Sequence, residues 1–318
     1  MGRSSRAVAR MAAQRIPDEA VLSLVRRDQV PRWTAIEGPE EPARPEPMSR
    51  WTRRRVLAVI GAGIAAAVVV SVALPALAPD QVLPTAAALT YRPVEGTSSG
   101  VLADLATKAA AQPAPPGSGP YHYLRTRSWS LGLTGTSDAD ISGARIAVYD
   151  RELWLQANGT GRLQTTQDGG PVHREEITGG LELGRHTPET LRTAQETNPP
   201  AAQWFDLIAE VWSSQVVTPQ TQNALLTTLA TRPDVTIEGE TTDRMGRKGI
   251  AFSTPNDNAR SATPNERLVL VFDPTTGALL DQETVATESG GLPINTPTST
   301  GYTVWLVSGF TPNTDTTP

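Results

Sequence analysis

The pentapeptide at residues 96–100, Gly-Thr-Ser-Ser-Gly, has the residue types of a serine nucleophile elbow. In that motif, G-x-S-x-G places the serine hydroxyl on a sharp strand-to-helix turn, from which it attacks a carbonyl carbon. A helix is expected from about Val101, but Pro93 interrupts any preceding strand, so half of the required context is missing. Ser98 is better explained as the cap of the following helix. A serine hydrolase is therefore the remotest function that we consider.

The three histidines, His122, His173 and His186, are the other candidates for catalysis or metal binding. Their spacing does not form the H-E-x-x-H pattern that places two imidazoles on one face of a helix. We expect His122 in a strand and the other two in loops. Because the spacing for metal ligands is missing, we expect no metal site, no cofactor and no enzymatic activity.

Composition and charge divide the chain into blocks. The 318 residues include no cysteine, which excludes disulfides, zinc–thiolate sites and thiol catalysis. Residues 1–55 hold 12 basic and 7 acidic side chains, residues 56–78 hold none, and residues 79–318 hold 16 basic and 26 acidic side chains. Three blocks of different charge indicate three different surroundings. The acidic third block argues against a nucleic acid partner.

The uncharged block, residues 56–78, predicts a transmembrane helix. Its 23 residues exceed the length that a helix needs to cross the bilayer, about 20 residues for roughly 30 Å of hydrocarbon. A cleaved signal peptide is the alternative, because Ala-Leu-Ala at residues 76–78 resembles a cleavage site. The block is longer than a signal-peptide core, however, and Pro79 would follow the cut, so we expect an uncleaved anchor.

The side chains before this block predict its orientation. Arg53, Arg54 and Arg55 precede it directly, and Trp51 lies among the arginines, where an interfacial indole is expected. By the positive-inside rule, the N-terminus is cytoplasmic and residues 79–318 are extracytoplasmic. The sequence therefore predicts a single-pass protein anchored in the lipid bilayer of the cell membrane.

The cytoplasmic head, residues 1–55, is predicted to be basic and largely disordered. Prolines and glutamates recur between Pro31 and Pro47, a composition that cannot bury a core. Two interpretations stay open. The head is either a topogenic tail with some attraction to anionic lipid, or residues 1–50 dock on a cytoplasmic regulator such as a sigma factor.

The outer block is predicted to contain a stalk at residues 79–97, an α+β domain at residues 98–310 and a disordered tail at residues 311–318. Alternation of apolar and polar residues indicates strands, several of them joined by turn signals such as Asn-Gly at residues 158–159. The predicted strands are residues 121–131, 146–155, 160–167, 235–238, 249–253, 268–272, 279–285 and 302–310.

Helices interrupt this series of strands. Residues 101–112 are rich in alanine, and Thr218-Pro219 has the residue types of a cap followed by proline at the first helical position. An apolar stripe with helical spacing indicates a further helix: Trp204, Phe205, Ile208, Val211 and Trp212. Strands, a two-helix insert and more strands predict an α+β fold, a half-barrel-like curved antiparallel sheet with helices on its concave face. Such a sheet encloses an apolar groove, which is either a ligand site or the core.

Short motifs follow one another in a recognisable order. They are Tyr-His-Tyr-Leu-Arg-Thr-Arg at 121–127, Glu-Leu-Trp-Leu at 152–155, Asp-Arg-Met-Gly-Arg at 243–247 and Phe-Asp-Pro-Thr-Thr-Gly at 272–277. In this order they resemble an uncharacterised family of single-pass actinobacterial membrane proteins, over roughly residues 97–310. More distantly, the outer domain resembles the half-barrel domains of LolA-like lipoprotein carriers and RseB-like sigma-factor regulators. The resemblance implies a fold and carries over no catalytic residues.

Two functions of different kinds follow from these expectations. The first is a membrane-anchored extracytoplasmic binding or sensor domain that regulates a cytoplasmic partner. The second is an anchored binder or carrier of a lipid or other apolar ligand in the groove, against which the permanent anchor argues. The residues do not indicate which side chains contact a ligand.

Overall fold

The computed structural model describes residues 82–137, 140–179, 186–196, 198–257, 263, 265–290 and 292–318. The predicted head and anchor, including Trp51, Arg53, Arg54 and Arg55, lie outside these residues. Within the described part of the chain, no helix is long and apolar enough to cross a membrane.

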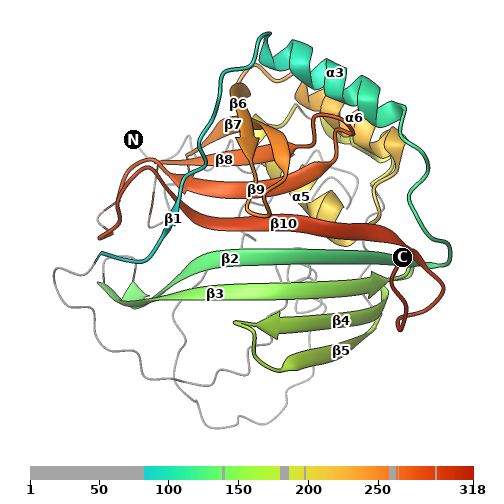
Figure 1. Cartoon of the computed structure of the whole chain (residues 1–318), viewed down its shortest axis with the longest axis horizontal. Helices are drawn as coiled ribbons and strands as arrows, with labels where there is room; N and C mark the ends of the chain where they lie inside the picture. Colours follow the sequence, from blue (N-terminus) through green and yellow to red (C-terminus); the bar gives the residue numbers. More distant parts are fainter. Residues whose placement is uncertain are drawn as a thin grey trace, which may run out of the picture.

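The described residues form one antiparallel sheet of ten strands (Figure 1). The strands are β1 (Ala86–Ala87), β2 (Tyr121–Ser137), β3 (Asp140–Leu155), β4 (Thr160–Gln167), β5 (Val172–Thr178), β6 (Thr236–Thr242), β7 (Lys248–Asp257), β8 (Asn265–Phe272), β9 (Leu279–Ala286) and β10 (Thr298–Thr311). Their order across the sheet is β5-β4-β3-β2-β10-β9-β8-β7-β6, and β1 pairs with β10 outside this path. The predicted antiparallel sheet is confirmed.

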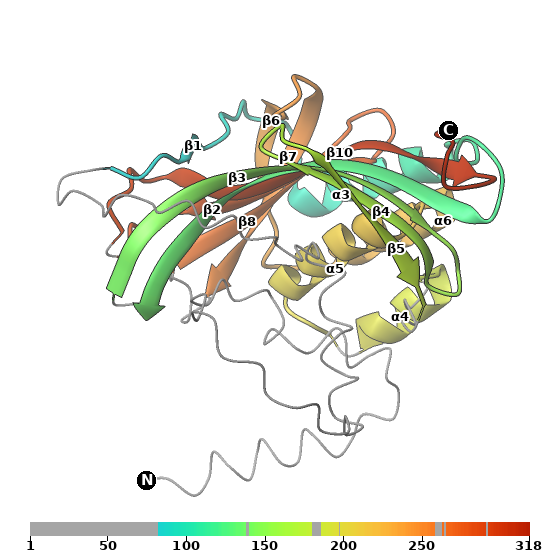
Figure 2. The same cartoon turned by 90° about the horizontal axis from the view of Figure 1, so that it is seen from below.

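The helices of the described residues are α3 (Ser98–Ala110), α4 (Pro188–Glu196), α5 (Ala201–Ser214) and α6 (Pro219–Leu229). Figure 2 shows the sheet as an arch with α4 and α5 beneath it, and Figure 1 shows α3 beside α6. The α+β class and the curved sheet are therefore confirmed. The insert holds three helices where two were predicted. Helix α4 was not predicted because it has little apolar periodicity: it buries little besides Leu191 and Ala194.

The main core lies between α5 and the concave face of the sheet. Trp204 and Phe205 of α5 are completely buried and belong to one cluster with Phe252 of β7, Phe272 of β8 and Trp305 of β10. Each large apolar side chain buried in this way contributes roughly 1.5–3 kcal/mol to folding. The sequence left open whether the apolar groove is a ligand site or part of the core. Over these strands it is part of the core.

Helix α6 begins as its sequence predicts. The side chain of Thr218 accepts a hydrogen bond from the main-chain N–H of Thr221 at 3.2 Å, and Pro219 occupies the first turn. This cap satisfies an N–H group that has no partner inside the helix, and proline removes another. The apolar side of α6 then places Leu225, Leu226 and Leu229 in the main core.

Two segments outside the long strands lie on the outer face of the sheet, the face turned away from the helices (Figure 2). We call residues 83–92 the strap and residues 312–318 the tail. The strap was expected to be part of a stalk, but its ends are bonded to the rest of the domain: the N–H of Leu83 donates to the carbonyl of Pro293 at 2.6 Å, and Arg92 and Glu240 exchange two main-chain hydrogen bonds of 2.8 Å.

The tail also differs from the expected disorder. Thr311 ends β10, and the tail continues along the outer face. The indole N–H of Trp154 donates to the carbonyl of Thr316 at 2.8 Å, and Arg162 donates to the carbonyl of Thr314 at 3.2 Å. A Thr/Pro-rich composition indicates low intrinsic order, but these donors from β3 and β4 hold the segment in place.

Candidate functional site

Ser98, the candidate nucleophile, has a structural role. The cap of α3 is Thr97, whose side chain accepts from the N–H of Gly100 at 3.1 Å, so the prediction that Ser98 caps this helix was wrong by one residue. The Ser98 hydroxyl instead accepts a hydrogen bond from the main-chain N–H of Ile237 at 2.9 Å. This bond ties the start of α3 to β6.

The histidines are dispersed. His122 lies in β2, as predicted, and its Nδ1 accepts from the N–H of Val216 at 2.9 Å. His173 lies in β5 and not in a loop, because the polar segment 172–178 pairs with β4 despite its weak apolar pattern. His186 precedes α4, with its Nε2 3.7 Å from Oε1 of Glu210. Among the described residues, no three His, Asp or Glu side chains are placed to hold a metal ion.

The unusual chemistry of the domain lies on the outer face of β9. Asp281 and Glu283 are two residues apart in this strand, so they point to the same face, and both are 0% exposed. We call them the acid pair. Neither carboxylate oxygen of Asp281, nor Oε2 of Glu283, has a partner with full hydrogen-bond geometry among the described residues. The main-chain N–H of Arg244 and the side chain of Ser299 are nevertheless near enough to lower the pKa of Asp281 and of Glu283, respectively. Two buried carboxylates are therefore incompletely compensated.

Burial changes the proton affinity of the acid pair. It raises the pKa of Asp281 to about 8, and the nearby charges of Glu283 and Asp243 add to this rise while Arg244 opposes it. Burial also raises the pKa of Glu283, although the hydrogen bond and charge of Arg244 hold it down. The physical cause is the high free energy of a charged carboxylate away from water. Asp281 therefore holds its proton near neutral pH.

Arg244 connects the acid pair to its surroundings. It belongs to the turn between β6 and β7, and its Nε donates to Oε1 of Glu283 at 2.6 Å. One terminal nitrogen donates to the carbonyl of Ala87 in the strap at 2.8 Å, and the guanidinium lies 5.1 Å from the ring centroid of Tyr302 on β10. One side chain thus bonds a buried acid and the strap at the same time.

The same turn is fixed to the sheet by Arg247. Its side chain donates to the buried carboxylate of Asp243 at 2.6 Å and to the carbonyls of Leu280 and Trp305 at 2.9 and 2.7 Å. The Asp-Arg-Met-Gly-Arg motif of residues 243–247 forms the hairpin turn between β6 and β7, in which the N–H of Gly246 donates to the carbonyl of Asp243 at 3.0 Å. In addition to forming this turn, its two arginines contact β9, β10 and the strap.

The strap covers the apolar positions next to the acid pair. Ala88, Leu89 and Tyr91 pack against a small outer cluster that includes Val271 and Val285. Val271 is the cross-strand partner of Asp281 in β8, and Val285 follows Glu283 on the same face of β9. Burial, with a further contribution from Glu283, raises the pKa of Tyr91 to about 12, and its hydroxyl has no partner in the described structure.

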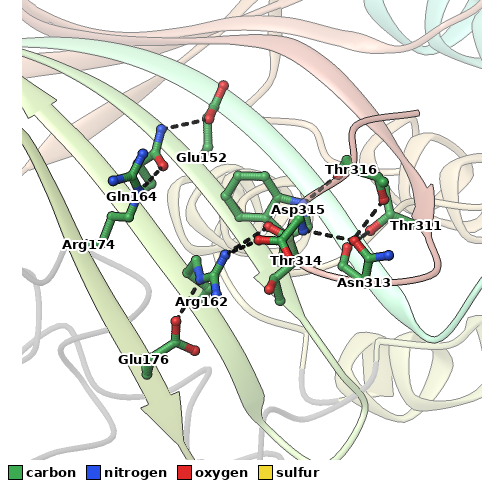
Figure 3. Close-up of polar contacts among 11 residues, drawn as sticks. Glu152, Arg162, Gln164, Arg174, Glu176, Thr311, Asn313, Thr314, Asp315 and Thr316 are labelled. Carbon is green, nitrogen blue, oxygen red and sulfur yellow. Dashed lines mark hydrogen bonds and ion pairs between the residues drawn. The ribbon is translucent and has the colours of Figure 1, made fainter.

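A second polar region lies under the tail, on the outer face of β3, β4 and β5 (Figure 3). Arg162 lies between two carboxylates, donating to Glu176 at 2.6 Å and to Asp315 of the tail at 2.7 Å. Gln164 continues the network by donating to Glu152 at 3.1 Å and accepting from Arg174 at 2.9 Å. In this region the carboxylates of Glu176 and Asp315 are paired with Arg162 and are exposed to solvent.

The comparisons with known proteins concern the fold. No family model and no curated protein matches the chain. Among solved structures, the chain is similar to the Pseudomonas aeruginosa MucA/MucB complex (13% identity, TM-score 0.25, covering 69% of this chain and 59% of that chain). It is also similar to a LolA superfamily protein from Nitrosomonas europaea (6%, TM-score 0.20, 68% and 94%). A third is a putative outer membrane lipoprotein-sorting protein domain from Vibrio parahaemolyticus (11%, TM-score 0.18, 67% and 93%).

These structures belong to the two groups that the sequence resembles distantly, the RseB-like and LolA-like proteins. The chain spans about 59% of the length of the MucB-complex chain that it matches. At such low identities and TM-scores the likeness carries no conclusion about ligand or partner. The function must be argued from the residues of this chain.

Proposed function

We propose that this protein is a membrane-anchored extracytoplasmic binding or sensor domain. One observation carries the proposal: the strap begins a few residues after the uncharged block 56–78 and is bonded across the outer face of the sheet. Arg244 joins it to Glu283, and Arg92 joins it to Glu240. A rearrangement of this face would therefore act directly on the segment that leads to the membrane.

The other parts of the proposal come from the sequence. Residues 56–78 span the membrane, with Trp51, Arg53, Arg54 and Arg55 at the cytoplasmic surface. Residues 1–50 contact a cytoplasmic regulator, for which a sigma factor is our first candidate. In this arrangement the outer domain binds a signal and the single helix connects it to the head.

The two alternative functions have less support. An apolar ligand in the concave face would have to share that face with α5, whose Trp204 and Phe205 already fill it over β7 and β8. A serine hydrolase would need Ser98 on a sharp strand-to-helix turn, but Ser98 is the first residue of α3 and its hydroxyl accepts from the N–H of Ile237, which ties the helix to β6. Neither observation supports its alternative, so the binding or sensor function is preferred.

Topology is tested first, using the absence of native cysteine. Single variants Ser4→Cys in the head and Met245→Cys, whose side chain is exposed on the outer domain, are labelled in intact cells with a membrane-impermeant maleimide. We expect Met245→Cys to react at once and Ser4→Cys only after permeabilisation. The reverse pattern, or release of the outer domain from washed membranes, would overturn the proposal.

The regulatory part is tested in native membranes. A photo-crosslinker attached to Ser4→Cys should recover a sigma factor or another transcriptional regulator, and a full-length chain with residues 1–50 scrambled should not. Equal recovery from both chains would show that the head has no specific partner and serves only as a topogenic tail. The outer domain would then not regulate a cytoplasmic protein through the head.

A further inference from the structure

We infer that the strap is a latch controlled by the ionisation of the acid pair: it is closed while Asp281 and Glu283 share one negative charge, and it is released when both are charged. The inference goes beyond the proposed function and concerns the outer domain alone. It remains testable if the chain proves to be anchored differently.

The strap is held by hydrogen bonds along its length and by the apolar contacts of Leu83, Leu89 and Tyr91. Its main chain bonds to Pro293 and to Glu240 at its two ends, and β1 adds a two-residue pairing with β10. Between these points the carbonyl of Thr90 accepts from the hydroxyl of Thr241 at 2.9 Å. The carbonyl of Ala87 accepts from Arg244 at 2.8 Å. The hydroxyl of Thr298 also contacts the hydroxyl of Thr85 at 2.7 Å and the carbonyl of Ala86 at 2.8 Å, and Leu83 is buried. The strap lies on the sheet without being one of its central strands, so it can detach without unfolding the sheet, because local opening needs only the free energy of the local contacts.

The closed strap leaves the acid pair with too little positive charge. Arg244 contacts Glu283, but Asp281 forms no ion pair among the described residues. The groups that face the pair from neighbouring elements are Asp243, Arg244 and Arg247 of the β6–β7 turn, Tyr302 of β10, Tyr91 of the strap, and the Glu238–Arg267 ion pair of β6 and β8.

Of these cations, Arg247 is engaged by Asp243 and Arg267 by Glu238 at 2.8 Å. Among the described residues, Arg244 is therefore the one cation that remains to compensate the charges of Asp281 and Glu283. A second buried negative charge would be uncompensated, and an uncompensated buried charge is costly. The closed state consequently retains a proton on Asp281.

Release of the strap removes this constraint. When Leu89 and Tyr91 leave the outer cluster, water reaches Val271 and Val285, the neighbours of the two acids. The pKa of Asp281 then falls from about 8 toward its ordinary value of 3.8. The closed state binds one more proton than the open state between these two values, so a rise in pH favours opening, by up to tenfold per pH unit.

Hydrogen–deuterium exchange of the full chain in detergent tests the latch. After correction for the intrinsic pH dependence of exchange, peptides from residues 83–92 should lose protection progressively between pH 5 and pH 8, while peptides from α6 keep theirs. Asp281→Asn keeps the shape of the side chain without its charge, so protection of the strap should become independent of pH. Asp150→Asn is the matched control, because Asp150 lies on the same face but is partly exposed and paired with Arg127; it should behave as wild type.

Two outcomes would overturn the inference. One is a wild-type strap whose corrected exchange does not change with pH, and the other is an Asp281→Asn variant that keeps the wild-type pH dependence. If Asp281→Asn fails to fold, Glu283→Gln replaces it. That variant leaves at most one negative charge, on Asp281, and frees Arg244 to pair with it, so the strap should stay protected up to pH 8; a loss of protection like that of wild type would equally contradict the latch.

Discussion

The strap and the tail cover the same face of one sheet, but the charged side chains under the strap are buried and those under the tail are exposed to solvent. Under the strap, Asp281 and Glu283 are 0% exposed and incompletely bonded. Under the tail, the side chains of Glu176 and Asp315 are 63% and 77% exposed and both contact Arg162. The two regions have similar numbers of charges and differ in access to water.

This difference decides which segment can respond to charge. Exposed ion pairs contribute only about 0–1 kcal/mol, because water solvates each partner almost as well as its neighbour does. Buried charges lack this alternative, so a single proton changes the free energy of the whole cluster. We therefore expect the strap to be sensitive to ionisation and the tail to be insensitive to it near neutral pH.

The largest effect should come from the arginines at the two sites. Arg244→Met leaves Glu283 buried without its cation and removes a bond to the strap, so we expect a loss of about 3–5 kcal/mol in the free energy of unfolding. Arg162→Met, the equivalent change under the tail, should cost about 1 kcal/mol or less. Urea denaturation at pH 7 measures both, and equal losses would remove the distinction between the two regions.

A pH-dependent difference should follow for Asp281. Because its pKa is raised in the folded state to about 8, its contribution to stability is complete below the unfolded value and is lost as the pH rises toward 8. The free energy of unfolding of Asp281→Asn should therefore increase relative to that of wild type, by up to about 1.4 kcal/mol per pH unit between pH 5 and pH 8. Unfolding curves at these two pH values give the difference, which should be absent for Asp150→Asn.

Removal of the tail should have a smaller effect. A chain ending at Thr311 loses the acceptor of the Trp154 indole N–H and two acceptors of Arg162, the carbonyl of Thr314 and the carboxylate of Asp315. The two bonds to main-chain carbonyls contribute about 0.5–1.5 kcal/mol each net, and the exposed Asp315 adds little, so we expect a destabilisation of about 1–3 kcal/mol. Thermal unfolding measures this loss. Hydrogen exchange of residues 83–92 should stay at the wild-type level, and a change there would show that the two segments are coupled.

The smallest effect is expected for Glu176→Gln. This exposed carboxylate pairs with Arg162 at 2.6 Å, and its loss should cost about 0.5 kcal/mol or less, a difference that disappears in high salt. A double-mutant cycle with Arg162→Met isolates the pair. A coupling above about 2 kcal/mol would mean that the tail shields this network as the strap shields the acid pair.

Much of the fold could be predicted because its signals are local. The period-two pattern of residues 121–131 identifies β2, and the spacing of Trp204, Ile208 and Val211 identifies α5. Thr218 and Pro219 set the start of α6. In each case the residues that decide the structure lie within a few positions of one another.

The elements that were missed depend on contacts with distant segments. The polar strand β5 exists because β4 offers it a hydrogen-bonding edge, and the Thr/Pro-rich tail is ordered because Trp154 and Arg162 donate to its carbonyls. Neither segment carries enough apolar periodicity to predict its structure. Ser98 and Thr97 could not be ranked as caps from sequence, since both residue types are favourable there.

The sequence by itself determined the uncharged block, its arginine flank, the antiparallel sheet and the apolar face of α5, because charge, composition and periodicity are properties of neighbouring residues. Asp281 and Glu283 fall within the predicted strand 279–285, but the sequence analysis did not identify them as functional residues. Only the tertiary structure decided that these acids are buried, since the strap and the turn carrying Arg244 reach β9 from far away in the chain. Burial, and with it the proton affinity of Asp281, is set by what covers a residue in space.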